Sequence, residues 1–185
     1  KYLNEQKNIM KIKSLNSQKE FNKFSIENGL GTIDGFVGLG KGTDTFNSNS
    51  TGSFIDITGL SLSITPSSTS SKIFLSFTIN GGASANNYAH FRLVRDSTAI
   101  GVGDAAGSRI QGTSNFRKTA TASQDTYTNE FLDSPSSTSS LTYKLQLVTE
   151  GGTHYINRSA ADNTSSTYFS GASNLTLMEV AAWVN

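Results

Sequence analysis

Apolar and polar side chains alternate along most of the chain from residue 53 onward. The alternation is clearest in three segments, residues 60–65, 73–79 and 141–149. Successive side chains of a β-strand point to opposite faces of its sheet, so a period of two predicts strands that cover a core with one face. We expect further strands at residues 89–95, 99–103, 126–132, 153–158 and 175–184.

The last predicted strand, residues 175–184, has apolar side chains on both faces. A strand of this kind is covered by the core on one side and by a neighbouring subunit on the other. We therefore predict that this strand lies at a subunit interface. The predicted interface residues are Met178, Val180, Ala182 and Val184.

Turn-forming residues separate the predicted strands, and no helical pattern lies between them. This organisation predicts an all-β fold, an antiparallel jelly-roll-like β-sandwich, with a barrel as the alternative. The hexapeptide Pro-Ser-Ser-Thr-Ser-Ser occurs at residues 66–71 and again at 135–140, and the two copies contain both prolines. Because proline has no amide proton to donate to a neighbouring strand, we interpret each copy as a turn that precedes a core strand.

The beginning of the chain has a different character. Residues 1–31 carry six lysines and three glutamates, a net charge of +3, whereas the remaining residues carry a net charge of −2. Apolar spacings of three and four predict a basic N-terminal arm, partly helical or extended, and such short helices need a partner to be stable. A frayed terminus is the alternative interpretation. The residues that we expect to dock the arm are Tyr2, Leu3, Ile9, Met10, Ile12, Leu15, Phe21 and Phe24.

A glycine-rich segment at residues 29–42 follows the arm. Gly35 to Lys41 match the G-x-x-x-x-G-K pattern of a phosphate-binding loop. That loop requires a serine or threonine next, to hold magnesium, and then a helix, but Gly42 and a polar stretch follow here. We therefore interpret the segment as a joint. Residues 1–45 are predicted to form the docking arm and joint, and residues 46–185 the β-sandwich domain.

Composition and charge exclude several classes of function. The net charge of +1 is too small to predict binding to nucleic acid, and no apolar run approaches the length that spans a membrane. The absence of cysteine excludes disulfides and thiolate chemistry. His90 and His154 fall inside predicted strands, so we expect surface or subunit-interface histidines rather than metal ligands. No G-x-S-x-G elbow or carboxylate pair is recognisable, and we expect no enzymatic activity, cofactor or metal.

From about residue 46 onward, several segments occur in an order that resembles a known group of proteins. The segments are Phe54–Ser68, Asn87–Arg109, Phe131–Pro135, Tyr155–Arg158 and Leu175–Glu179. In this order they resemble the carboxy-terminal domain of tail-fibre and other virion surface proteins of tailed bacteriophages. The resemblance implies a β-sandwich on a virion made in the host cytoplasm, usually a homotrimer without enzymatic activity. It implies no particular set of binding residues.

The short arm distinguishes this chain from a fibre tip, which follows a long stalk. An arm followed by one sandwich also suits a capsid decoration protein, and both locations remain open. In either case we expect the partners to be two further copies of the chain and other virion proteins, contacted through the arm.

A carbohydrate-binding module is the alternative function, with a host surface glycan as the partner. Aromatic faces stack on sugars, and amides form hydrogen bonds with sugar hydroxyls. The candidate contact residues are Asn86, Asn87, Tyr88 and Tyr168, although core or interface packing accounts for the same aromatic side chains.

Overall fold

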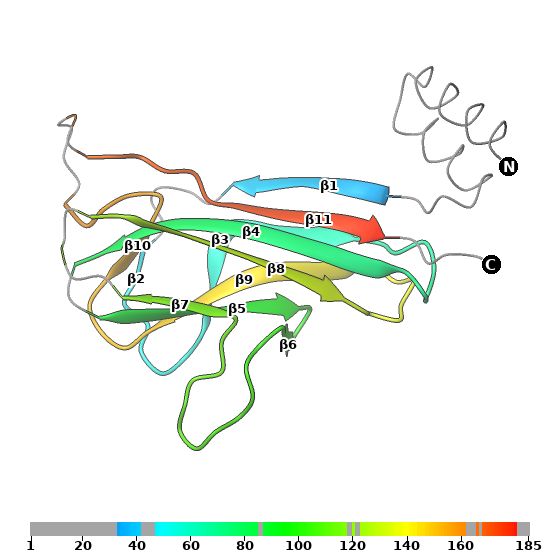
Figure 1. Ribbon diagram of the computed structural model, residues 1–185, viewed down its shortest axis with the longest axis horizontal. Helices are drawn as coiled ribbons and strands as arrows, with labels where there is room; N and C mark the ends of the chain where they lie inside the picture. Colours follow the sequence, from blue (N-terminus) through cyan, green and yellow to red (C-terminus); the bar gives the residue numbers. More distant parts are fainter. Residues whose placement is uncertain are drawn as a thin grey trace, which may run out of the picture.

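The computed structural model describes residues 33–41, 47–84, 87–117, 120, 123–161, 166 and 168–180. These residues form eleven strands and no helix (Figure 1). The strands are β1 (Ile33–Lys41), β2 (Asn47–Ser48), β3 (Ile55–Ile64), β4 (Lys72–Ala83), β5 (Tyr88–Arg95), β6 (Thr98–Ile100), β7 (Ser114–Arg117), β8 (Asp125–Asp133), β9 (Leu141–Thr149), β10 (His154–Ile156) and β11 (Asn174–Val180).

The strands are arranged in two antiparallel sheets. The first sheet has the order β1-β11-β4-β10-β2, and β8 pairs with the other side of β4. The second sheet has the order β3-β9-β5-β6, and β7 also pairs with β5. Figure 1 shows β4, β8 and β11 on one side of the molecule and β5, β7 and β9 on the other. The predicted all-β sandwich is confirmed, and its strands form two separate sheets rather than one closed barrel.

The core lies between the two sheets and contains the side chains that the alternation assigned to it. Fully buried residues come from β4 and β11 in the first sheet and from β5 and β9 in the second. Burying one Leu, Ile or Phe side chain stabilises a fold by about 1.5–3 kcal/mol. The fully buried aliphatic and aromatic residues of these strands are Ile73, Leu75, Phe77, Ile79, Phe91, Leu93, Tyr143, Leu145, Leu147, Leu175 and Leu177.

The glycine-rich segment that we interpreted as a joint is a strand. Its residues Ile33–Lys41 form β1, which pairs with β11 at the edge of the first sheet; Val37, for example, lies opposite Leu177. Two shifts in register interrupt the pairing. Glycine has no side chain to contribute to the alternation, so backbone pairing with β11 defines a strand here that the side-chain pattern does not reveal.

Both copies of the repeated hexapeptide lie in turns that precede core strands, as predicted. The first copy leads into β4 and the second into β9. The first turn also has a structural partner, because the amide nitrogen and the hydroxyl of Ser67 each donate to Oε1 of Glu179 at 2.7 Å. Glu179 is buried on β11, and this turn provides the hydrogen bonds that a buried carboxyl group needs.

Candidate functional site

The predicted ligand-contact residues are not all close together. Tyr88 is the first residue of β5 in the second sheet and is 37% exposed, and Asn87 precedes it. Tyr168 is half-buried and belongs to a segment that packs on the first sheet, where the Gly171 amide donates to Asn157 and the Asn157 amide donates to Asn80 of β4. Asn86 lies outside the described residues. The structure therefore separates Tyr168 from Tyr88.

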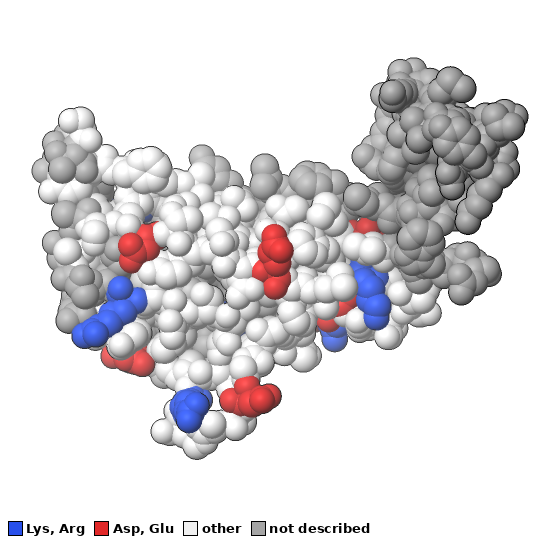
Figure 2. All heavy atoms as spheres, in the orientation of Figure 1, with Lys and Arg blue, Asp and Glu red and all other residues white. Residues whose placement is uncertain are grey.

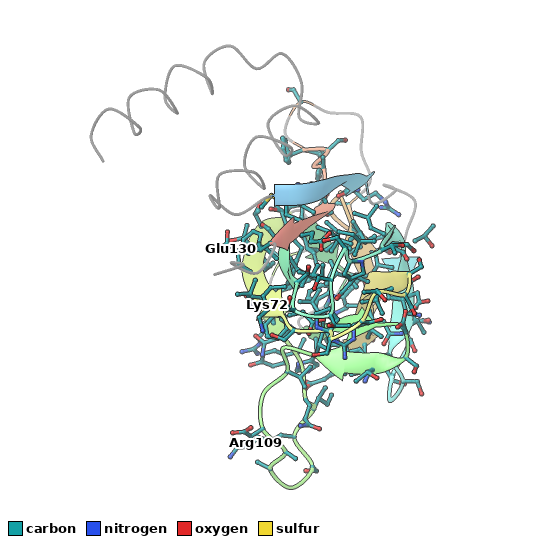
Figure 3. The ribbon with its side chains drawn as sticks, turned by 90° about the vertical axis from the view of Figure 1, so that its right-hand side faces the viewer. Lys72, Arg109 and Glu130 are labelled. Carbon is teal, nitrogen blue, oxygen red and sulfur yellow. The ribbon has the colours of Figure 1, made fainter. Side chains whose placement is uncertain are left out.

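A polar pocket lies beside Tyr88. The next outward-facing residue of β5, His90, lines this pocket. The pocket has a volume of about 390 Å³ and is bounded by β5, β7 and the loop of residues 101–113 that joins β6 to β7. This loop extends away from the two sheets (Figure 1), and Arg109 lies far out along it (Figure 3). The lining residues are His90, Ile110, Gly112, Thr113, Ser114 and Asn115.

Backbone pairing and loop hydrogen bonds hold the pocket in place. His90 on β5 lies directly opposite Asn115 on β7, so both side chains are on the outer face of the second sheet. The Thr113 amide donates to the Phe91 carbonyl at 2.7 Å, and the Thr113 hydroxyl accepts from the Leu93 amide at 3.0 Å. A Cβ atom at Gly112 would lie 2.9 Å from the same Phe91 carbonyl oxygen, so the loop can return this close to β5 only with glycine.

His90 forms one wall of the pocket, and its ring is oriented by an acidic neighbour. Its Nε2 lies 3.0 Å from Oε1 of Glu150. Because an ionised carboxylate only accepts hydrogen bonds, Nε2 carries a proton and donates it to Glu150. The Tyr88 ring is stacked near His90 with 6.2 Å between centroids, and the Arg117 guanidinium lies 5.3 Å from the Tyr88 centroid.

One polar side chain on the outer face beside His90, that of Asn115, is unpaired among the described residues. Within the part of the chain that the structure describes, the Asn115 amide has no hydrogen-bond partner, whereas Ser114 lies opposite Phe91 and its side chain points to the other face of the sheet. No described hydroxyl donates to His90 either, so the pocket lacks the bond between nucleophile and base that activates a serine. The arrangement can therefore offer neutral hydrogen-bond donors and acceptors to a ligand.

Sequence reasoning selected Tyr88 and missed the pocket next to it. His90 was assigned a surface or interface role, and nothing in the local pattern places Ser114 and Asn115 beside it. The sequence does not reveal β7 as a strand, because its four residues contain a single apolar side chain, Phe116. Only the pairing of β7 with β5 brings these residues together.

The expectation that His154 lies at a surface or an interface is wrong. It is completely buried in β10, opposite Ala83 of β4 on one side and Ser48 of β2 on the other. Its ring lies edge-on to Phe116 with 5.3 Å between centroids, and among the described residues neither ring nitrogen has a partner with hydrogen-bond geometry. Burial lowers the pKa of His154 to about 4, although the nearby Gly151 backbone opposes part of the shift.

A second surface of interest is the outer face of the first sheet. In the register of the strands, Met178 of β11, Phe74 of β4 and Leu132 of β8 lie side by side in one row. Val180 lies on the same face, 39% exposed, and Leu132 is 53% exposed. The predicted interface residues Met178 and Val180 thus belong to this face, while Ala182 and Val184 lie outside the described residues. We call Phe74, Leu132, Met178 and Val180 the apolar row.

Sequence reasoning did not select Phe74 and Leu132 for this surface. The signal was present, because Phe74 stands among polar residues in the outward-facing phase of β4. Two charged residues lie on the same face. Lys72 is opposite Val180, and Glu130 is one row from Leu132 (Figure 3). Figure 2 shows that charged side chains are sparse over the visible face of the described residues.

No group of three or more His, Asp or Glu side chains in the described ranges is arranged to hold a metal ion. No helix in the same ranges is long and apolar enough to cross a membrane. The docking-arm residues from Tyr2 to Phe24 lie outside the described part of the chain.

No protein-family model matches this chain, and no curated protein matches it in sequence. Among solved structures, the chain is similar to VP2 of infectious bursal disease virus, in the crystal structure of a VP2 subviral particle. The two chains are 13% identical, with a TM-score of 0.35, and the match covers 80% of this chain. It covers 41% of the VP2 chain, so this chain spans less than half the length of VP2.

Proposed function

We propose that this chain is a non-enzymatic structural and interaction protein on the surface of a bacteriophage virion, where it assembles as a homotrimer. The ordered sequence resemblance to virion surface proteins suggests this role. The observation that carries the proposal is the apolar row on the outer face of the first sheet. In an antiparallel sandwich the outer face of a sheet meets water and is normally polar, so adjacent exposed apolar side chains mark a contact surface.

Further copies of the same chain are the occupants of this surface. Lys72 and Glu130 give the face one positive and one negative charge close to the apolar row. A face that carries both signs can be complementary to itself when copies meet around a symmetry axis. Leu132 is the most exposed member of the row, and burial of the 53% that is still exposed adds about 1 kcal/mol for each copy.

The N-terminal arm supplies the attachment to the particle. Its net charge of +3 and its regularly spaced apolar residues suit a segment that lies along another virion protein. The attached domain then stands outward, either as a tail-fibre domain or as a capsid decoration. The sandwich begins with β1 directly after the arm, which suits an attachment through one short segment.

Two experiments test the proposal. Light scattering on the purified chain should give three times the chain mass of 19.7 kDa, and a stable monomer would contradict the homotrimer. Imaging of phage particles that carry a labelled copy should locate the label on the head or the tail, and label found only in unassembled material would contradict a virion role. Deletion of residues 1–31 should abolish incorporation while the sandwich stays folded, and unchanged incorporation would rule out docking by the arm.

A further inference from the structure

We infer that the pocket between β5, β7 and the 101–113 loop is a binding site for a neutral saccharide, with the Tyr88 ring as an adjoining contact surface. The inference goes beyond the proposed virion role, because it concerns the second sheet and does not require the trimer. It rests on the pocket's size, on the chemistry of its walls and on the aromatic side chain beside it.

The size of the pocket suits a small polar ligand. Its volume of about 390 Å³ falls near the lower end of the range of about 300–1,000 Å³ that is typical of small-molecule sites. Its position also suits a ligand from solution, since Ile110 and the outer part of the loop are exposed. A single sugar unit fits such a space while the rest of an oligosaccharide extends over the surface.

The walls of the pocket select against charge. The lining residues are a histidine, an isoleucine, a glycine, a threonine, a serine and an asparagine. No carboxylate, lysine or arginine lines the pocket. Asp104 and Arg109 lie in the same loop, carry opposite charges and are not among the lining residues. A neutral ligand rich in hydroxyl groups is therefore the best match.

The unpaired Asn115 amide supplies hydrogen bonds that such a ligand needs. The Asn115 amide lies on the same face as His90 and offers two donors and an acceptor. No other described residue uses the Asn115 amide. Glu150 fixes the ring of His90, so His90 presents a defined wall rather than a mobile one. Groups that are already oriented lose less entropy when a ligand binds.

Tyr88 adds the apolar contact that saccharide sites commonly use. Its ring stacks near His90 on the same face of β5 and remains 37% exposed. The C–H face of a sugar ring is apolar and packs on an aromatic ring, while its hydroxyls reach polar groups at the side. Tyr88 and the pocket together thus offer both kinds of contact over a short distance.

The test uses the full chain and a glycan array that contains neutral and acidic oligosaccharides. We expect binding of at least one neutral oligosaccharide, followed by titration calorimetry on the strongest hit. Asn115→Ala and Tyr88→Ala should each weaken binding about tenfold or more. The matched controls are Asn49→Ala and Phe169→Ala, which remove an exposed amide and an exposed aromatic ring elsewhere and should leave binding unchanged.

Several outcomes would overturn the inference. Absence of binding by every neutral oligosaccharide at millimolar concentration would do so, as would equal binding by Asn115→Ala and wild type. Preference for acidic glycans, lost in Arg109→Ala, would reject the neutral class of ligand. If Asn115→Ala does not fold, amide chemical-shift mapping on the wild type takes its place, and shifts that avoid residues 112–115 would place the ligand elsewhere.

Discussion

The hydroxyl oxygen of Tyr143 lies 2.7 Å from Oδ2 of Asp133, and this hydrogen bond joins the two sheets. Tyr143 belongs to β9 and Asp133 to the end of β8, and both are buried. Arg95 of β5 donates to the same carboxylate oxygen through Nη1 at 2.6 Å. Burial, followed by the hydrogen bond to Asp133, raises the pKa of Tyr143, so the phenol stays protonated and remains a donor.

Asp133→Ala is expected to destabilise the sandwich by about 2–4 kcal/mol, because it leaves a buried phenol and a partly buried guanidinium without their acceptor. Urea unfolding followed by circular dichroism measures the change. Asp104→Ala is the matched control, since Asp104 is exposed in the 101–113 loop, and it should change stability by less than about 0.5 kcal/mol. Equal stability of the two variants would show that the contact between sheets contributes nothing.

His154 is expected to make the fold sensitive to mild acid. The unfolded chain binds a proton at His154 below its ordinary pKa of 6.5, whereas the folded chain does so only near pH 4. The unfolded state therefore binds more protons in this interval, and the free energy of unfolding falls as the pH is lowered from 6.5 to 4, by up to about 3 kcal/mol.

His154→Leu should remove this part of the pH dependence, as measured by thermal unfolding at a series of pH values. His90→Gln is the control, because His90 lies in the outer pocket and pairs with Glu150. The His90→Gln control should still lose stability as the pH is lowered from 6.5 to 4, as the wild type does. If both variants follow the wild-type curve, the buried histidine is not the group responsible.

Gly82 and Gly103 form a matched pair of glycines. A Cβ atom at Gly82 would lie 2.7 Å from the Ser159 Cα and 2.9 Å from the Arg158 carbonyl oxygen, both of which are backbone atoms that cannot rotate away. A Cβ atom at Gly103 would have no neighbour within 4 Å. We expect Gly82→Ala to cost about 1–3 kcal/mol and Gly103→Ala to be nearly neutral, as measured by the midpoint of urea unfolding.

Leu132→Glu should dissociate the trimer, because it places a charge in the apolar row that copies of the chain bury in the proposed assembly. Sedimentation or light scattering at several protein concentrations measures the effect. Ile110→Glu is the matched control, since Ile110 is also an exposed aliphatic residue but belongs to the loop on the second sheet. A trimer that survives Leu132→Glu would place the interface elsewhere.

The two charges beside the apolar row allow a separate test. If Lys72 and Glu130 of neighbouring copies attract each other, Lys72→Glu should lower the association constant of the trimer about tenfold at low salt. The double variant Lys72→Glu/Glu130→Lys should restore the wild-type association constant. At high salt the variants and the wild type should have similar association constants, because salt screens the attraction between surface charges. If the trimer of the double variant is weaker than that of Lys72→Glu alone, Lys72 and Glu130 do not pair between copies.

The sequence was most informative where one face of a strand meets the core. The strand β9 was predicted with both of its boundaries, Leu141 and Thr149, because every second side chain in it is apolar. β7 was missed because one buried phenylalanine in four residues produces no recognisable period. β1 was missed because its glycines carry no side chains, and the pairing partner that completes it is far away in sequence.

The candidate sites were harder to predict than the strands. Met178 and Val180 could be assigned to an outer face because the alternation of β11 is apolar in both phases. Phe74 and Leu132 join them only through the register of β4 with its two neighbours. The pocket depends on the same kind of distant pairing, since His90 and Asn115 are 25 positions apart and meet only because β7 pairs with β5.

The pairing of β1 with β11 has a mechanical consequence for a domain held by its amino-terminal end. Tension applied from the amino-terminal side enters the sandwich at Ile33, the first residue of β1. Ile33 pairs with Val180, the last residue of β11. A pull along β1 loads its backbone hydrogen bonds together in shear, whereas a pull away from the sheet opens them one pair at a time. The direction in which the domain is held thus decides whether this edge resists force or peels open.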